Sequence, residues 1–177
     1  MRFTNILTLT LATTAISAPL TKTKRALEDY EAVFTSIGSQ VAVVSSTVSS
    51  YVSGSVPGSD VQTVSNDLVS VINSGATDVA TFDSLSSLDA LALVTPIQDL
   101  TADVGDLVDA VIAAESNFES DGLSGDVLAS LEDQKGAAEA LRDAVTPKVP
   151  AALQDIAQEL AEGIVSEIER GIAAYSD

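Results

Sequence analysis

Apolar side chains recur along residues 27–51 at the spacing of one face of an α-helix. This spacing, three and four positions without a break, winds them into one continuous stripe. The other faces carry Ser, Thr, Ala and Gln, and no charged residue occurs from Ala32 to Ser59. The pattern predicts a long helix with an apolar inner face and an uncharged outer face. The stripe consists of Leu27, Tyr30, Phe34, Ile37, Val41, Val44, Val48 and Tyr51.

Poor helix formers leave a second interpretation of this segment open. Val, Ser and Thr have low helix propensity on exposed faces, and residues 40–52 would suit a strand if apolar and polar residues alternated strictly. Val43-Val44 followed by Ser45-Ser46 breaks that alternation. We therefore predict a helix here and expect packing, rather than propensity, to stabilise it.

Four further segments repeat the helical spacing between turn residues. The predicted helices start at Ser59-Asp60, at Thr95-Pro96, at Ser124 and after the connector 146–150, and residues 73–75 could interrupt the first of these four. Ser59 and Thr95 are expected to be N-cap residues, and proline is favoured at a first helical position. The predicted fold class is all-α, a single antiparallel helical bundle of about five main helices.

The first 25 residues carry processing signals. An early Arg, an apolar run and small residues around Ser17 and Ala18 are typical of a secretory signal peptide over residues 1–17. The dibasic pair Lys24-Arg25 would end a propeptide over residues 18–25, which leaves one domain over residues 26–177. Because Asp or Glu recur along the rest of the chain, we expect no transmembrane segment there.

Charge and composition exclude much chemistry. The chain has 26 acidic and eight basic residues, and its formal charge of −18 becomes −22 if both cuts occur, since four basic and no acidic residues leave. Such a surface repels nucleic acid and anionic membranes. Because it contains neither His nor Cys, the chain cannot form a Ser-His-Asp triad or a Cys nucleophile. It also cannot form a zinc or haem site that uses His or Cys as ligands. We expect no enzyme, no cofactor and no metal.

One acidic array is the remaining candidate for metal or acid–base chemistry. Asp99, Asp103, Asp106 and Asp109 recur three and four positions apart on one predicted helix. The composition of a calcium loop is missing around them. We interpret the array as a solvated face, with a carboxylate-pair hydrolase as the one enzyme class left open.

The order and spacing of several short features resemble a known family. They are Lys24-Arg25 before an acidic amphipathic helix, the restart at Thr95-Pro96-Ile97, the break at Asp121-Gly122, the connector 145–150 and the ending 171–175. Together they resemble the secreted fungal family of hydrophobic surface-binding protein A, which includes cell-wall galactomannoprotein antigens. The resemblance implies a five-helix bundle, secreted to the medium or wall, that adheres to hydrophobic surfaces or holds fatty acids in a cavity.

Localisation follows from the same resemblance. The C-terminus lacks the polar spacer and apolar tail of a lipid-anchor signal, so we expect a secreted, extracellular or cell-wall protein with loose wall association. No Asn-x-Ser/Thr acceptor is present, so any mannosylation would be O-linked.

Whether the interior of the bundle is filled or hollow decides whether the protein can hold an apolar ligand. Val, Ala and Ile side chains allow either a filled core, which the residues alone favour, or an apolar cavity, which the resemblance favours. We expect a non-enzymatic protein that binds fatty acids or other apolar ligands in a bundle cavity. The alternatives are an adhesion protein that coats hydrophobic surfaces, or a passive O-mannosylated cell-wall antigen. The expected cavity lining is Phe34, Ile37, Val41, Val44, Leu100, Val104, Val111, Leu131, Leu141, Ile156, Leu160 and Ile164.

A bound carboxylate needs a polar partner. Ser45, Ser49 and Thr101 lie beside the apolar stripes and are candidates for the head group. The cations Lys135, Arg142 and Lys148 could also pair with it, although cations near a helix C-terminus commonly complement the helix dipole.

Overall fold

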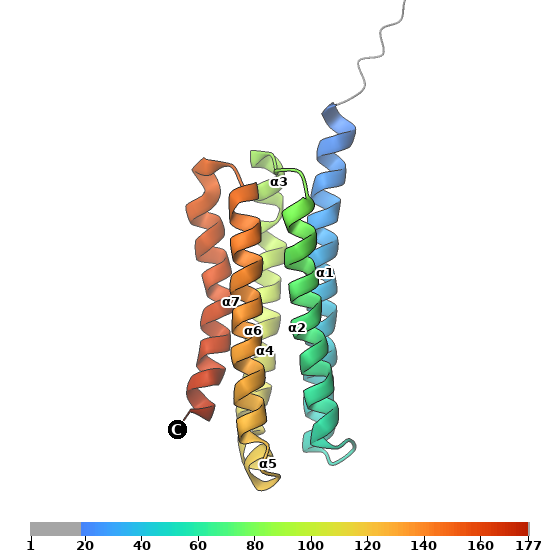
Figure 1. Cartoon of the computed structure of the whole chain (residues 1–177), viewed down its shortest axis with the longest axis vertical. Helices are drawn as coiled ribbons and strands as arrows, with labels where there is room; N and C mark the ends of the chain where they lie inside the picture. Colours follow the sequence, from blue (N-terminus) through green and yellow to red (C-terminus); the bar gives the residue numbers. More distant parts are fainter. Residues whose placement is uncertain (1–18, 177) are drawn as a thin grey trace, which may run out of the picture.

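Five long helices run alternately down and up the molecule. The computed structural model describes residues 19–176, with side chains from Ala26 onward, and these residues confirm the all-α prediction. Figure 1 shows the long helices side by side, with one short helix at each end of the bundle. The predicted signal-peptide residues Ser17 and Ala18 lie outside the described part. The long helices are α1 (Pro19–Val52), α2 (Gly58–Thr81), α4 (Val94–Ala113), α6 (Ser124–Val145) and α7 (Gln154–Tyr175). The short elements are α3 (Ser87–Ala92), α5 (Glu115–Ser120) and the 3₁₀ turns η1 (Thr146–Lys148) and η2 (Ala151–Leu153).

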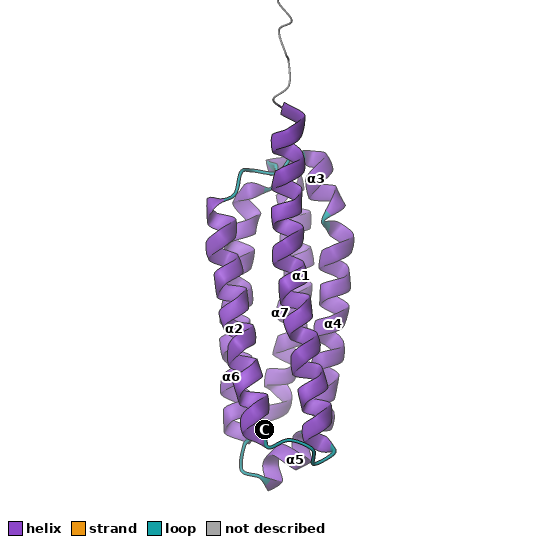
Figure 2. Cartoon of the chain, turned by 90° about the vertical axis from the view of Figure 1, so that its right-hand side faces the viewer, coloured by secondary structure: helices purple, strands orange, loops and turns teal. Residues whose placement is uncertain are grey.

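The five long helices form a closed ring. α1 packs against α2 and α4, α2 also packs against α6, and α7 closes the ring between α6 and α4. Figures 1 and 2, viewed at right angles, agree with this arrangement. Each long helix therefore has two main neighbours and turns its remaining apolar surface toward the centre of the ring.

The stripe on α1 is the inner face of that helix. All of its residues from Tyr30 to Tyr51 are buried, and Leu27 is half-buried. The outer face carries hydroxyl groups that bond back to the preceding turn. Ser39 Oγ donates to the Thr35 carbonyl, and Thr47 Oγ1 donates to the Val43 carbonyl. Self-satisfied hydroxyl groups let a Ser- and Thr-rich face remain helical without charged side chains.

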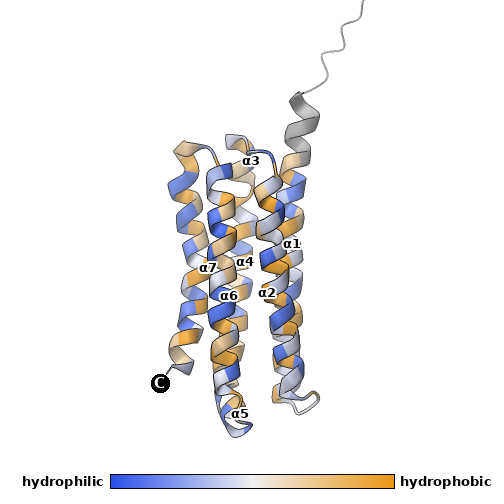
Figure 3. Cartoon of the chain, in the orientation of Figure 1, coloured by the Kyte–Doolittle hydropathy of each residue, from blue (hydrophilic) through white to orange (hydrophobic). Residues whose placement is uncertain are grey.

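The same helix has the length and composition of a membrane span over Ala26–Val52. The sequence prediction that no later segment has these properties is wrong for this helix, because Ser, Thr and Ala dilute its apolarity but add no charge. Its apolar stripe is buried in the bundle, so the helix also has the properties of a core helix. Figure 3 shows mixed polar and apolar colouring along its length.

Two predicted N-caps are wrong. α2 begins at Gly58, with Pro57 in the N-cap position, so Ser59 lies inside the helix. α4 begins at Val94, and no side chain caps it, because α3 leads into it through Leu93 in a helical conformation. Ser86 supplies the cap one element earlier, where its Oγ accepts from the Asp89 N–H at 3.2 Å.

The helix α2 is continuous through residues 73–75, where the sequence allowed an interruption. Gly75 is buried there because α1 approaches closely. A Cβ at Gly75 would lie 2.7 Å from Val33 Cγ1, a distance that requires a shift. The glycine therefore serves helix packing and does not break the helix.

We predict opposite effects of Gly→Ala at two helical positions. Gly136→Ala has open space around it, so it should raise the free energy of unfolding by about 1 kcal/mol through helix propensity. Gly75→Ala should lose that gain and destabilise the protein by about 1 kcal/mol or more, because a β-branched side chain opposes the added methyl group. Chemical denaturation measures both. Equal stabilisation by the two substitutions would contradict the close approach of α1 and α2.

Candidate functional site

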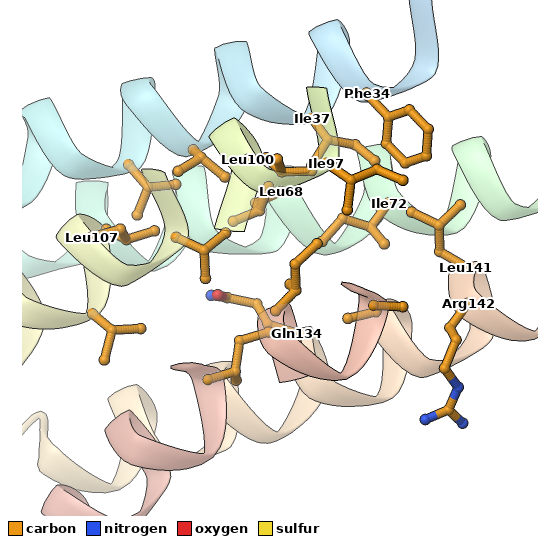
Figure 4. A pocket seen from close by; sticks show the side chains of 18 of the residues that line it. Phe34, Ile37, Leu68, Ile72, Ile97, Leu100, Leu107, Gln134, Leu141 and Arg142 are labelled. Carbon is orange, nitrogen blue, oxygen red and sulfur yellow. The ribbon is translucent and has the colours of Figure 1, made fainter. Parts of the chain in front are cut away.

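An apolar cavity occupies the centre of the ring. Its volume is about 130 Å³, which is the space that about four waters fill in the liquid at ~30 Å³ each. Figure 4 shows side chains from several helices converging on this space. Because its walls are mostly aliphatic, the cavity suits a hydrocarbon better than water.

The structure brings together all of the residues that the sequence proposed for a cavity lining. The twelve side chains come from α1, α4, α6 and α7, and each lines the cavity. Their role in binding stays a prediction. The helix α2 supplies a further wall that the predicted site left out. The twelve are Phe34, Ile37, Val41, Val44, Leu100, Val104, Val111, Leu131, Leu141, Ile156, Leu160 and Ile164, and α2 adds Val61, Leu68 and Ile72.

Phe118 lines the cavity at its α5 end, and two tyrosine rings pack against it. Tyr51 stacks on Phe118 with ring centroids 4.6 Å apart, and Tyr175 meets the edge of Phe118 at 6.4 Å. Tyr51 Oη donates to Asp121 Oδ2 at 2.8 Å, and Tyr175 Oη donates to the Val111 carbonyl at 2.7 Å. The three rings, with both tyrosine hydroxyl groups hydrogen-bonded, form an aromatic end wall.

The phenol groups of this wall are held in the neutral form. Burial, followed by the Asp121 hydrogen bond, raises the pKa of Tyr51 to about 12. Burial also raises the pKa of Tyr175. At the other end of α1, burial raises the pKa of Tyr30 to about 12, where the ring packs edge-on against Phe82.

The opposite end of the cavity is open. Leu91 and Ile156 line the cavity although 53% and 46% of their surfaces are exposed. Leu153 and Leu160, which are half-buried, also line this end. Between α3 and the start of α7 these side chains form an apolar mouth. Beside it, the Leu85 N–H donates to the Lys148 carbonyl at 2.9 Å and ties the two connecting segments together.

The cations beyond residue 25 turn away from the cavity. Arg142 touches its rim, but its guanidinium donates to Asp143 Oδ1 at 3.0 Å and to Glu162 at 3.4 Å, and Figure 4 shows it directed away from the apolar side chains. Lys148 Nζ donates to the Ala80 and Phe82 carbonyls at 2.9 and 2.7 Å. It therefore complements a helix C-terminus, that of α2.

The remaining two cations connect α7 to its neighbours. Lys135 pairs with Glu169 at 2.8 Å, and Arg170 pairs with Asp109 of α4. Hydrogen bonds to those carboxylates raise the pKa of each cation. Exposed pairs of this kind add little stability individually.

The structure does not bring the three candidate hydroxyl groups to the cavity. Ser49 Oγ donates to the Ser45 carbonyl at 3.0 Å, and Thr101 Oγ1 donates to the Ile97 carbonyl at 2.9 Å. None of Ser45, Ser49 and Thr101 is among the described residues that line the cavity. Ser49 is exposed, and Ser45 and Thr101 are half-buried beside neighbouring stripe positions.

Two buried polar lining residues were missed from the sequence. Ser65 is 5% exposed and Gln134 is 7% exposed, and both line the cavity. The sequence did contain a signal for these two residues, because each occupies a position within an apolar stripe. Gln134 falls between Leu131 and Ala138 at helical spacing, and Ser65 falls between Val61 and Leu68. A polar residue in an apolar stripe marks either a buried hydrogen bond or a binding group.

Comparison with known proteins agrees with the resemblance seen in the sequence. The family described as Hydrophobic surface binding protein A matches residues 27–147. Cell wall mannoprotein 1 of Aspergillus flavus and that of Aspergillus fumigatus are 40% and 39% identical over 177 residues, the whole of this chain. The chain spans 63% and 61% of the length of these two relatives.

Solved structures of similar fold include two domains of the Penicillium marneffei MP1 protein. Ligand binding domain 1, complexed with arachidonic acids, has a TM-score of 0.81 at 25% identity and covers 86% of this chain and 100% of that chain. Ligand binding domain 2, complexed with multiple arachidonic acids, has a TM-score of 0.74 at 27% identity and covers 91% and 98%. With the family match extending over most of the helical bundle, the chain belongs to the hydrophobic surface binding protein A family.

Proposed function

We propose that this protein is a non-enzymatic binder of long-chain fatty acids or similar acyl ligands, which it holds in the central cavity. The observation that carries the proposal is the closed ring of helices around an apolar cavity with one aromatic end wall and one apolar mouth. An acyl chain entering at Leu91 and Ile156 would run along the central axis of the ring toward Phe118. The twelve predicted lining residues would then form its binding surface.

Burial of the acyl chain would supply the affinity. Each buried methylene contributes about 0.8 kcal/mol, and the cost of immobilising a flexible chain reduces the total. An empty apolar cavity destabilises the protein in proportion to its volume. A ligand that fills it would therefore stabilise the folded state by mass action.

Relatives support this ligand class. The two MP1 domains that share the fold are described as complexed with arachidonic acids. The mannoprotein names of the two Aspergillus relatives support placement outside the cell, at the wall or in the medium. Cleavage after Ser17 and at Lys24-Arg25 remains part of the proposal, and α1 runs as a helix through the dibasic pair.

Filling the cavity should abolish much of the binding. We expect Ala138→Phe, at a half-buried lining position of α6, to displace about two methylenes of bound palmitic acid. That loss is about 1.6 kcal/mol, or roughly 15-fold in Kd. Isothermal titration of lipid-stripped protein with palmitic acid measures it.

The matched control is Ala140→Phe, which adds the same ring two residues away at an exposed position of the same helix. It should leave the Kd unchanged. Equal losses in both variants, or wild-type protein with no thermal shift for acyl ligands of any length, would overturn the proposed function. The latter result is the one expected of a passive wall antigen.

Adhesion to hydrophobic surfaces is a second candidate. Leu88 is 78% exposed on α3, beside the exposed Leu91 at the mouth. Exposed apolar clusters commonly mark contact sites. Adhesion through this tip would need no stoichiometric lipid.

The adhesion candidate predicts that Leu88→Ser lowers adsorption to polystyrene at least several-fold while palmitic acid binding is retained, since Leu88 does not line the cavity. Depletion of protein from solution onto beads measures adsorption. The exposed Val52→Ser, at the far end of α1, is the control. Adsorption that is the same in all three proteins would exclude the tip as the adhesive site.

A further inference from the structure

The cavity contains an amide group with no hydrogen-bond partner among the described residues. Gln134 is 93% buried, yet within residues 19–176 no hydrogen bond to its side chain is found. Figure 4 shows its polar end among aliphatic side chains at the cavity. Its polar atoms are not sealed from the cavity space, because the described chain has no fully enclosed side-chain polar atom without a partner.

Ser65 repeats this situation on the neighbouring helix. It is 95% buried, it lines the cavity, and its Oγ has no partner among the described residues. Most other hydroxyl groups of α2 bond back to the preceding turn, as Thr63 Oγ1 does to the Ser59 carbonyl and Ser70 Oγ does to the Asn66 carbonyl.

The two groups lie on adjacent helices at similar heights. α2 and α6 pack against each other and run in the same direction (Figure 1). Their first turns meet where Leu123 occupies the space that a Cβ on Gly58 would fill. Counted from that contact, Ser65 and Gln134 differ by about one helical turn, on the order of 5 Å.

An unpartnered buried amide costs stability unless something binds it. Leaving a polar group without a hydrogen bond in an apolar site costs about 1–3 kcal/mol. No described side chain supplies the missing partner. A ligand that enters the cavity with a polar group would supply it.

The cavity lining, as far as the structure describes it, offers this polar group no cation that is free of a carboxylate partner. Its lining contains two titratable side chains, both on α6, among the described residues: Asp126 and Arg142. The lining residues of α1, α2, α4 and α7 carry no titratable group. Asp126 would repel a carboxylate, and the Arg142 guanidinium is held by Asp143 and Glu162.

We propose, resting on the proposed function, that Gln134 with Ser65 binds the head group of the acyl ligand inside the cavity in uncharged form, as a protonated carboxylic acid or an alcohol. A carboxylic acid is matched to a primary amide by two hydrogen bonds. The acid carbonyl accepts from Gln134 Nε2, and the acid O–H donates to Gln134 Oε1. A carboxylate only accepts, so it would leave Oε1 unsatisfied and repelled. Burial in an apolar site also raises the pKa of a carboxylic acid, because desolvation disfavours the charged form.

Dodecanoic acid and 1-dodecanol have carbon chains of the same length, but only the acid can ionise. Comparing them therefore isolates the effect of head-group charge on binding. Wild-type protein is titrated with each between pH 5.5 and 7.5, above the ordinary carboxyl pKa of about 4.3. If only the protonated acid binds, its apparent affinity should fall about tenfold per pH unit. The affinity for the alcohol should stay constant over the same range.

The decisive variant is Gln134→Met, which keeps the volume of the side chain and removes the amide. We expect it to weaken both ligands about tenfold at pH 5.5. In the ligand-free state we expect it to raise the melting temperature by about 3 °C, because it removes an unpartnered polar group. A glutamine that does not bind the head group would leave both affinities unchanged.

The matched control is Gln40→Met. Gln40 Nε2 donates to the Val64 carbonyl at 3.1 Å, and the residue does not line the cavity. This variant should lower the melting temperature and leave both affinities unchanged.

Two outcomes would overturn the inference. Binding of dodecanoic acid that is independent of pH and unaffected by Gln134→Met would leave acyl binding intact but place the head group elsewhere. Failure of the wild-type protein to bind either ligand would refute the proposed function itself, and this inference with it.

Discussion

The structure depends on one geometric constraint, the closure of five helices into a ring. Helices that pack 8–10 Å apart lie about 8 Å from the centre of a five-membered ring, whereas their radius with side chains is about 5–6 Å. A ring of four would bring the axes to about 6–7 Å, where side chains meet and fill the core. In a ring of five, side chains such as Leu68, Leu100 and Leu107 line a narrow central space. The cavity thus follows from the number of helices.

The two ends and the charges adapt this ring to an apolar occupant. Tyr51, Phe118 and Tyr175 form a wall at one end, and exposed leucine and isoleucine side chains surround the mouth at the other. Arg142 and Arg170 are used outside, where they connect α7 to α6 and α4. The interior is therefore left with neutral groups. Although the protein is strongly acidic, the described residues at the centre of its cavity therefore carry no charge of either sign. Charged side chains of the described part touch the cavity only at its rim.

Helical periodicity predicted much of the fold and of the cavity lining, because inward-facing positions repeat every three or four residues whatever fills the centre. It placed Val41 and Leu141 on inner faces correctly. It could not decide between a filled core and a cavity, since that depends on how the helices close on one another. The predicted N-caps Ser59 and Thr95 were wrong for local reasons. Pro57 already sets the start of α2, and the helical turn before α4 already sets the start of that helix. Gln134 was overlooked because apolar residues alone were sought in the stripes.

Isotope-filtered NMR of the labelled protein with unlabelled palmitic acid tests the central claim most directly. If the acyl chain lies inside the ring, its methylene protons should show nuclear Overhauser effects to the methyl groups of Leu68, Leu100 and Leu107, which line the cavity. These three side chains come from α2 and α4, so contacts to all of them require a ligand between the helices. Effects confined to exposed side chains such as Leu88 and Val52 would show that the ligand lies on the surface and would contradict the account.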